Sequence, residues 1–151
     1  GGGEQDLAST IANLRQITCA SPAYLRKYGE PKTLEDLKHH RAVNYVSRTT
    51  AKLFPFEFMV DGELKEVAIE GAVSVFGAEI YAASAIAGLG LIQCPHYRME
   101  AQISQGLVQE VLIDTSPPPM PVSVLYPHNR HMSPRVRVFV DWLGEVFAGA
   151  Q

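Results

Sequence analysis

The stretch GAEIYAASAIAGLGLIQCP, residues 77–95, constrains the fold of this chain more than any other. Its first half has only Glu79 and Ser84 as polar residues, and a helix that is apolar on nearly all sides is expected to be buried. Gly88 and Gly90 predict the end of that helix, because glycine adopts the positive φ of a helix C-terminus without steric cost. A short apolar strand, closed by a proline, follows. A helix, a tight turn and a strand in this order form the sheet-packing unit of an α/β domain.

The rest of the chain alternates strand signals with helix signals. The patterns predict strands over 15–20, 42–46, 54–60, 64–69, 72–76, 107–113 and 122–126, and helices over 22–28, 33–39, 96–104 and from 134 towards 149. Asp61-Gly62 predicts a hairpin turn, and Ser21 and Thr33 are predicted helix N-caps. Residues 7–14 are only weakly patterned. Hairpins mixed with strand–helix–strand units predict an α/β or α+β domain with a mixed sheet.

Length and composition describe an ordinary folded domain. The 151 residues suffice for one domain with a core, and 46% hydrophobic with 19% charged residues is typical of a globular chain. The net charge of −3 gives no broad attraction to nucleic acid or to an anionic membrane. No apolar run reaches the roughly 18 residues that a membrane-spanning helix needs. No signal peptide opens the sequence, although a processed or truncated N-terminus would look the same.

Cys19 and Cys94 are the only cysteines, and they lie far apart in the sequence. One pair at this separation is not a disulfide framework, and a reduced cytoplasm suits it at least as well. Two interpretations stay open at this point. The cysteines are either two small buried hydrophobic residues or a redox pair.

No catalytic or metal-binding set emerges from the sequence. The glycine pair at 88–90 ends a helix, whereas the dinucleotide fingerprint opens a helix after a strand. His128 and His131 lack the third and fourth ligands of a zinc site, so we expect solvated loop histidines. Cys94 and His96 would need a third group to orient the imidazole, and none is in place. The sequence therefore predicts no enzyme, no cofactor and no metal site, and it favours a binding domain.

Four motifs resemble those of the effector-binding domain of LysR-type transcriptional regulators. They are ITCASPAYLRKYGEPKTLEDLKHHRAVNY (17–45), AASAIAGLGLIQCP (82–95), GLVQEVL (106–112) and VSVLYPHNRHMSPRVRVFVDWL (122–143). Each motif alone is weak, but the four in this order and spacing are quite specific. The resemblance covers the chain from about Ile17 to Phe147.

The resemblance implies an α/β fold of the periplasmic-binding-protein-like type 2 class, with mixed sheets. In this family two lobes are joined by crossing strands, and a small molecule binds between them. Residues 1–20 would be the tail of lobe one and the first hinge strand, 21–121 would be lobe two, and 122–151 the second hinge strand and the return to lobe one. One lobe would be complete and the other partial. The family's helix-turn-helix domain is missing here, so DNA would be bound only through a part outside this sequence.

The family's effector contacts, carried over by resemblance, fall at the hinge, at a strand end and at the start of the helix predicted in residues 77–95. In this chain they are Ser21, Asn44, Tyr45, Phe76, Gly77, Ala78 and Glu79. The family often has Asn and Asp where this chain has Phe76 and Gly77, so an aromatic ring replaces a polar contact. We therefore expect a small effector of partly aromatic or apolar character, with a carboxylate as the alternative.

The resemblance implies the effector-sensing and oligomerising domain of a cytoplasmic transcription regulator, without a membrane partner. Two rivals from other classes stay open. One is a solute-binding protein of the same fold that serves transport, and the other is an enzyme that uses Cys94 or His96. The resemblance also implies that the last helix covers the sheet of lobe one, which is incomplete here. We expect the apolar stripe of that helix to pack on a second copy, on a separate piece of the same protein, or back on lobe two.

Overall fold

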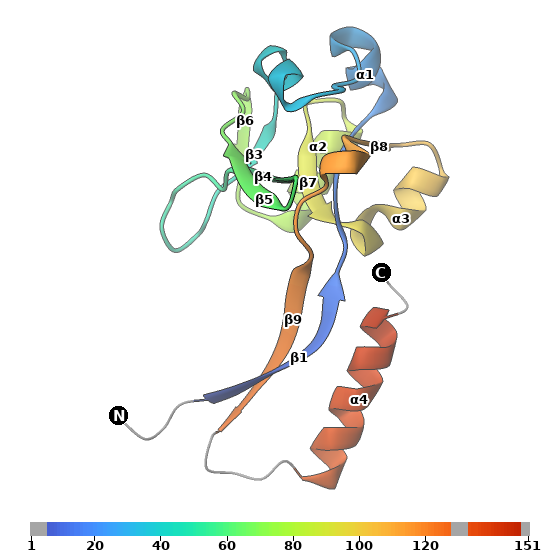
Figure 1. Ribbon diagram of the computed structural model, residues 1–151. Helices are drawn as coiled ribbons and strands as arrows, with labels where there is room; N and C mark the ends of the chain where they lie inside the picture. Colours follow the sequence, from blue (N-terminus) through green and yellow to red (C-terminus); the bar gives the residue numbers. More distant parts are fainter. Residues whose placement is uncertain (1–5, 128–132, 149–151) are drawn as a thin grey trace. The chain divides into compact units, whose positions relative to one another are not determined.

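The computed structural model describes residues 6–127 and 133–148, and the chain divides into two compact units (Figure 1). Unit 1 consists of residues 1–15 and 119–151, and unit 2 consists of residues 16–118. The sequence-based boundary after residue 20 assigns the strand at 16–20 to the hinge, whereas the structure places this strand inside unit 2. The roles of the two lobes stay a prediction. Each unit is described by itself below.

Unit 2 is built on a mixed sheet. Its elements are β2 (Gln16–Ala20), α1 (Pro22–Tyr28), the 3₁₀ helix η1 (Leu34–His39), β3 (Val43–Tyr45), β4 (Phe56–Val60), β5 (Glu63–Val67), β6 (Val73–Val75), α2 (Ala78–Ile86), β7 (Ile92–Pro95), α3 (His96–Ser104), β8 (Gln109–Val111) and the 3₁₀ helix η2 (Ile113–Thr115). β2 lies between β7 and β8 and is antiparallel to both. β3 and β6 pair in parallel, and a parallel bridge between Ala42 and Leu91 joins β3 to the start of β7.

Two glycines allow the close approach at this bridge. A Cβ atom on Gly90 would lie 2.8 Å from the carbonyl oxygen of Arg41, and a Cβ atom on Gly71 would lie 2.1 Å from that of Ala42. Both contacts are with backbone atoms, which cannot move aside as a flexible side chain does. The start of β3 is therefore reached from both sides only because these two positions carry no side chain.

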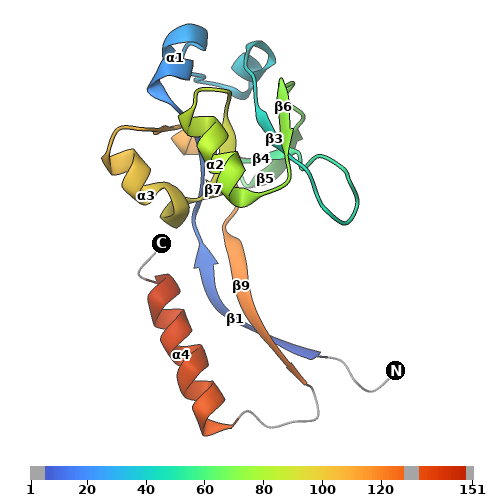
Figure 2. The ribbon, with the colours of Figure 1, turned by 180° about the vertical axis from the view of Figure 1, so that it is seen from behind.

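The sheet of unit 2 carries a separate apolar core on each face. Ile17 and Cys19 of β2 belong to the core that packs under α2 and α3. Ala20 belongs to the other core, with Tyr24 of α1 and Phe58 of β4. This division follows from the alternation of side chains along a strand. The two views of the ribbon agree, since α2 lies in front of β7 in Figure 2 and the hairpin of β4 and β5 lies in front in Figure 1.

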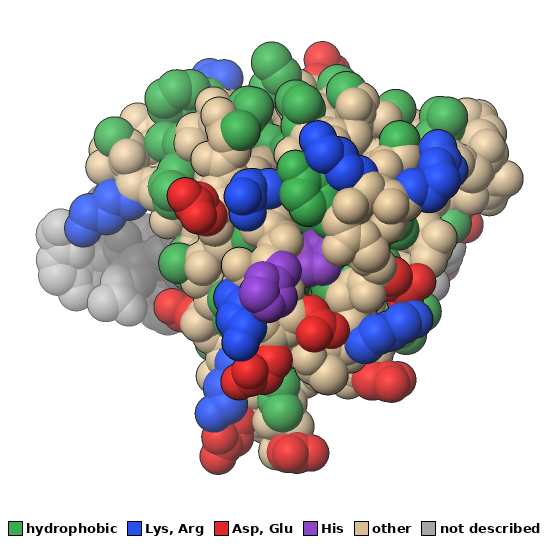
Figure 3. Space-filling view, turned by 90° about the horizontal axis from the view of Figure 1, so that it is seen from above, with side chains coloured by type: hydrophobic (Ala, Val, Ile, Leu, Met, Phe, Trp, Pro, Cys, Tyr) green, Lys and Arg blue, Asp and Glu red, His purple; other side chains and the backbone are tan. Residues whose placement is uncertain are grey.

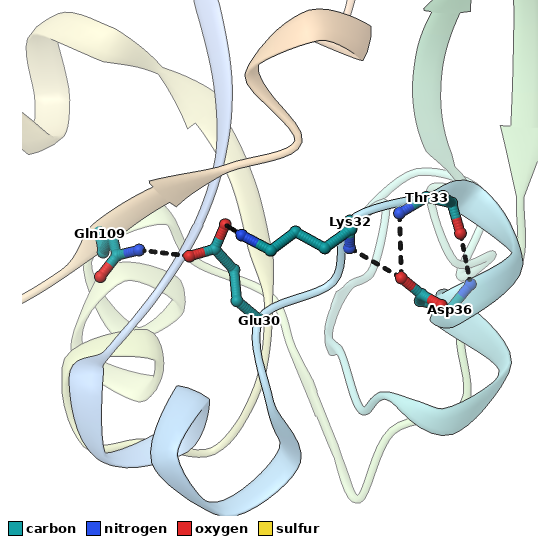
Figure 4. Close-up of polar contacts among 5 residues, drawn as sticks. All are labelled: Glu30, Lys32, Thr33, Asp36 and Gln109. Atoms are coloured by element: carbon teal, nitrogen blue, oxygen red, sulfur yellow. Dashed lines mark hydrogen bonds and ion pairs between the residues drawn. The ribbon is translucent and has the colours of Figure 1, made fainter.

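The connector between α1 and η1 is held by polar contacts on both sides (Figure 4). The predicted N-cap at Thr33 is confirmed, and it forms a capping box with Asp36. Thr33 Oγ1 accepts from the Asp36 N–H at 3.3 Å, and Asp36 Oδ2 accepts from the Thr33 N–H at 3.0 Å. The backbone N–H groups of Lys32 and Thr33 hold the pKa of the Asp36 carboxyl below its usual value. Towards β8, Glu30 accepts from Lys32 Nζ at 2.9 Å and from Gln109 Nε2 at 2.8 Å.

The predicted hairpin is also confirmed. β4 and β5 pair antiparallel across Asp61-Gly62, and these two residues have φ values of 52° and 79°. Positive φ at both central positions is the geometry of a tight hairpin turn whose twist matches that of the strands.

The prediction that the helix in residues 77–95, α2, is wholly buried is wrong. In α2 the buried residues are Tyr81, Ser84 and Ala85, whereas Ile80 is 56% exposed. The reason is that small apolar residues occupy almost every position of α2, so the sequence pattern does not distinguish the buried side from the exposed side. The predicted stop is confirmed, since Gly88 has a φ of 87°.

The described residues of unit 1 form two strands and one helix. β1 (Asp6–Leu14) pairs antiparallel with β9 (Met120–Pro127), with an irregularity between Thr10 and Ala12. The helix α4 (Pro134–Ala148) packs on β1, where a Cβ atom on Gly144 would lie 3.2 Å from the Ile11 carbonyl oxygen. Val140 is the buried residue on this side of α4. The large apolar residues that α4 leaves exposed are Val136, Val138, Phe139, Trp142 and Val146.

Candidate functional site

Two parallel strands of unit 2 end side by side at one edge of the sheet. Tyr45 of β3 pairs with Val75 of β6, and the Val46 N–H donates to the Val75 carbonyl oxygen at 2.8 Å. Phe76 and Gly77 then lead directly from β6 into α2. We call the end of the sheet formed by Tyr45, Val46, Val75 and Phe76 the β3–β6 edge. Loops at the carboxyl ends of parallel strands commonly form ligand sites in α/β sheets.

The first turn of α2 begins at this edge. Gly77 is the N-cap residue and, having no side chain, offers no side-chain cap to the N–H groups of the first turn. Such N–H groups can donate to an oxygen of a ligand. The carboxylate of Glu79 lies exposed in the same turn, and it opposes the binding of an anion.

Aromatic rings surround the end of β3. The ring of Tyr45 meets the ring of Tyr81 edge-on, with centroids 5.1 Å apart, and it lies 5.8 Å from the ring of Phe54. Phe54 and Phe76 are each more than half exposed, at 53% and 52%. The hydroxyl of Tyr81 accepts from the Gln93 N–H at 3.0 Å, and burial raises the pKa of this hydroxyl. The β3–β6 edge therefore presents a partly exposed aromatic surface whose inner ring, Tyr81, is fixed.

The structure brings Tyr45, Phe76, Gly77, Ala78 and Glu79 together, but two of the predicted contacts lie elsewhere. Asn44 points to the opposite face of the sheet from Tyr45, is 7% exposed, and donates from Nδ2 to the Ile69 carbonyl oxygen at 3.3 Å. Its amide therefore holds the chain that enters β6.

Ser21 lies at the other end of the sheet. β2 runs antiparallel to β7, so its carboxyl end, where Ser21 follows, is opposite to the β3–β6 edge. Ser21 is 2% exposed, and its Oγ accepts from the Tyr24 N–H at 3.1 Å. Both facts describe the N-cap of α1 that the sequence also predicts.

Sequence reasoning did not select three residues that shape this region. Phe54 and Tyr81 contact the ring of Tyr45, and Gln93 fixes Tyr81 through its N–H. Tyr81 is the one aromatic residue among the small residues of α2, and this contrast could have marked it in the sequence. Phe54 had no such signal, because it reaches β3 through the Val46–Leu53 bridge that closes a loop.

Cys19 and Cys94 contact each other in the core under α2 and α3, and both are free thiols in the structure. The nearby Cys94 thiol and burial raise the pKa of Cys19, whereas the nearby Cys19 thiol lowers the pKa of Cys94. The side-chain partner of Cys94 is thus a second thiol rather than the imidazole of His96.

The described residues contain no group of three or more His, Cys, Asp or Glu side chains that could hold a metal ion. His128 and His131, the sequence-predicted pair of loop histidines, lie outside the residues that the structure describes. No helix within residues 6–127 and 133–148 is long and apolar enough to span a bilayer.

A surface cavity of about 460 Å³ lies away from the β3–β6 edge. It is lined by residues of η1 and of the segment after β5, among them Leu34, Leu37, His40 and Val67. The face of unit 2 that carries η1 mixes both signs of charge, and Figure 3 shows Lys and Arg side chains interspersed with Asp and Glu. The lining of this cavity includes none of the predicted contact residues.

Comparison with known proteins gives a consistent family. The model of the LysR substrate binding domain matches residues 7–148. The uncharacterized HTH-type transcriptional regulator YhjC of Escherichia coli (strain K12) is 31% identical over 140 residues, which cover 93% of this chain and 47% of the relative. The HTH-type transcriptional repressor PA14_22550 of Pseudomonas aeruginosa is 27% identical over 142 residues, covering 94% and 45%. The chain thus spans about half the length of the curated relatives it matches.

Solved structures share the same fold. The regulatory domain of CrgA, a LysR-type transcriptional regulator from Neisseria meningitidis, matches with a TM-score of 0.73 and 24% identity over 96% of this chain and 69% of that one. Full-length AphB, the Vibrio cholerae virulence activator, matches with a TM-score of 0.75 and 23% identity over 95% and 48%.

The fold is therefore the α/β, periplasmic-binding-protein-like type 2 fold of these regulatory domains, as predicted. The chain belongs to the LysR substrate binding domain family, the effector-binding domain of LysR-type transcriptional regulators. Its relatives are transcription regulators rather than transporters or enzymes, so neither rival class is supported.

Proposed function

We propose that this chain senses a small molecule at the β3–β6 edge of unit 2 and forms part of a homo-oligomeric LysR-type regulator. The observation that carries the proposal is the exposed aromatic surface of Phe54 and Phe76 beside the uncapped first turn of α2. The contact residues proposed here are Tyr45, Phe76, Gly77, Ala78 and Glu79. LysR-type regulators bind DNA through a helix-turn-helix domain, so we place DNA binding in a part of the protein outside this chain and the protein in the cytoplasm.

The chemistry of the edge favours a neutral aromatic effector. Aromatic rings prefer offset or edge-to-face contact, and a planar ligand ring can make such contacts with Phe54 and Phe76. A neutral carbonyl or amide oxygen can accept from the N–H groups of the first turn of α2. A carboxylate would lie near Glu79, the one charged side chain in that turn, and like charges repel.

The effector can signal only by favouring one conformation over another. A ligand that binds two states equally shifts no equilibrium, whatever its affinity. Contacts with Tyr45 and with the start of α2 couple the ligand to the end of β3 and to the helix at once. We propose that occupancy changes the relation between these elements, which the regulator then transmits.

Ligand binding to the purified chain tests the proposal. Benzamide is the neutral aromatic probe, benzoate is its matched anion, and hexanoate is the aliphatic acid. We expect benzamide to raise the melting temperature more than benzoate at equal concentration, and hexanoate to have no effect. A larger shift with benzoate would support the carboxylate alternative instead.

Variants locate the binding. We expect Phe76→Ala to weaken binding of benzamide about five-fold, since an aromatic contact contributes roughly 0.5–1.5 kcal/mol. Ile113→Ala is the matched control, because Ile113 is 61% exposed on η2 and belongs to no predicted contact. Calorimetry in which Phe76→Asn and Phe76→Ala leave every affinity unchanged would count against this site.

A further inference from the structure

The two cysteines of unit 2 meet across neighbouring strands. In the antiparallel pairing of β2 with β7, Cys19 lies opposite Ile92, and Cys94 lies opposite Ile17. The cysteines are therefore two positions apart along the pairing and point to the same face of the sheet. Diagonal neighbours of this kind are close enough for side chains to touch, and both thiols belong to the same buried core. The strands bring together two residues separated by most of unit 2.

The two thiols have different surroundings. Cys94 lies near the end of β7 and retains 8% exposure, whereas Cys19 lies in the central strand β2 and has none. The nearby Cys19 thiol and the positive charge of Arg98 on α3 both favour the thiolate of Cys94. On the other side, Glu110 of β8 disfavours the thiolate of Cys19. Cys94 is thus the better nucleophile, with Cys19 placed as its neighbouring thiol.

We propose that Cys19 and Cys94 are a modification site at which a hydroperoxide forms a reversible disulfide between β2 and β7. The Cys94 thiolate attacks one oxygen of the hydroperoxide and breaks the O–O bond, which gives Cys94 sulfenic acid and an alcohol, or water from hydrogen peroxide. The Cys19 sulfur then attacks the sulfenic sulfur, the S–O bond breaks, and the hydroxyl leaves as water with the Cys19 proton. The two sulfurs lose two electrons in total, which the hydroperoxide accepts.

This site is independent of the proposed effector contacts. A bond between the sulfurs would fix the end of β7 to β2 just before Pro95, where the chain enters α3. The hydroxyl of Tyr81 lies in the same core and accepts from the N–H of Gln93, the residue before Cys94. Disulfide formation would therefore act on the strand that supports Tyr81, without a ligand at the β3–β6 edge.

Hydrogen peroxide treatment of the full 151-residue chain tests the proposal. We expect the number of titratable thiols in the denatured chain to fall from two to none and dithiothreitol to restore both. The chain mass should fall by two hydrogen atoms. Trypsin should release residues 16–26 linked to residues 66–98, the two peptides that contain the cysteines. The product should remain a single chain in non-reducing electrophoresis.

The single variants separate a disulfide from independent oxidation. In Cys19→Ala, Cys94 should gain oxygen atoms and form no linked peptide. In Cys94→Ala, Cys19 should keep its thiol under the same peroxide exposure, since it is the buried partner. Persistent titratable thiols in the wild type, oxygen addition without the linked peptide, or a disulfide between chains would each overturn the proposal. All three wild-type readings stand even where a variant folds poorly.

Discussion

The side chain of Gln93 joins the central sheet of unit 2 to the strand β4. Its Oε1 accepts from the Glu57 N–H, and its Nε2 donates to the Glu57 carbonyl oxygen and to Thr18 Oγ1, each at 2.9 Å. Gln93 therefore satisfies both backbone groups of one residue in β4, a role that an apolar side chain cannot perform.

We predict that Gln93→Met lowers the free energy of unfolding by about 2 kcal/mol, because it leaves the two Glu57 backbone groups without their partner. Gln109→Met is the matched control. It removes an exposed hydrogen bond to Glu30, so its effect should stay below about 0.5 kcal/mol. Urea titration of both variants makes the comparison, and equal midpoints would contradict the role given to Gln93.

His40 is a buried imidazole whose protonation opposes folding. It is 4% exposed, and its Nδ1 lies 2.7 Å from the hydroxyl of Tyr24. Burial holds the pKa of His40 below its usual value, although the carboxylate of Asp36 acts in the opposite direction. A group with a lowered pKa in the folded state takes up its proton more readily after unfolding.

We therefore predict that His40 makes unfolding easier as the pH falls below about 6.5, the value for an unfolded histidine. Its contribution is fully present above that pH and is lost as the pH falls towards the lower folded value. His40→Asn should reduce the loss of unfolding free energy between pH 7.5 and pH 5.5. The exposed neighbour gives the control, and His39→Asn should keep the wild-type difference. Identical pH profiles for wild type and His40→Asn would refute this.

At the scale of elements, the position of Ser21 at the start of α1 favours a role as helix N-cap over a role as effector contact. The resemblance made Ser21 an effector contact, but in the structure its hydroxyl caps the helix and is enclosed. We predict that Ser21→Ala destabilises the chain by about 1 kcal/mol, the usual effect of losing an N-cap. Ser104→Ala, at the exposed end of α3, should change the unfolding midpoint little. A stable Ser21→Ala variant with weaker ligand binding would restore the first role.

Local signals predicted most elements of unit 2, but not their partners. Ser21 with Pro22, the capping box at Thr33 and the Asp61-Gly62 turn each act within a few residues, so the sequence alone locates them. β1 was missed because its segment is weakly patterned and its pairing is with β9, at the other end of the chain. A strand whose partner is so distant leaves no local signature.

The same contrast between local signals and distant pairing applies to the residues of the candidate site. Tyr45 and Phe76 come together because Tyr45 is the last residue of β3 and Phe76 directly follows the parallel strand β6, and the sequence predicted both strand ends. Ser21 could not be placed from sequence, since nothing in residues 16–20 states that β2 runs against β7. Asn44 and Tyr45 are neighbours in β3, so their side chains point to opposite faces of the sheet. The sequence did not indicate which face α2 and α3 cover, so it could not show which of the two side chains lies beside α2.

At the scale of the whole molecule, the exposed face of α4 predicts association. Val138, Phe139 and Trp142 are each at least half exposed, and the rings of Phe139 and Trp142 stack with centroids 6.1 Å apart. A contiguous apolar surface of this kind is a common sign of an interaction site. Of the three partners expected from the sequence, a second copy is the one whose binding would make association depend on the concentration of the chain.

We predict a concentration-dependent dimer that Val138→Lys shifts towards monomer, as measured by sedimentation velocity. Trp142 is the only tryptophan, so its emission should move to longer wavelength on dilution as the ring becomes hydrated. Val122→Lys, on β9 rather than on α4, is the control and should leave the association unchanged. A monomer at all concentrations, with constant emission, would rule out this partner.

The position of β2 also has a consequence for how the chain is made. β2 is the first strand of unit 2 to leave the ribosome, but both of its neighbours come late, and Thr18 meets Gln93 across 75 residues of sequence. Pairings of such separation form slowly, because a long loop must close first. The central strand β2 therefore waits without its two neighbours until β7 and β8 have been made, and the sheet of unit 2 can close around it only then.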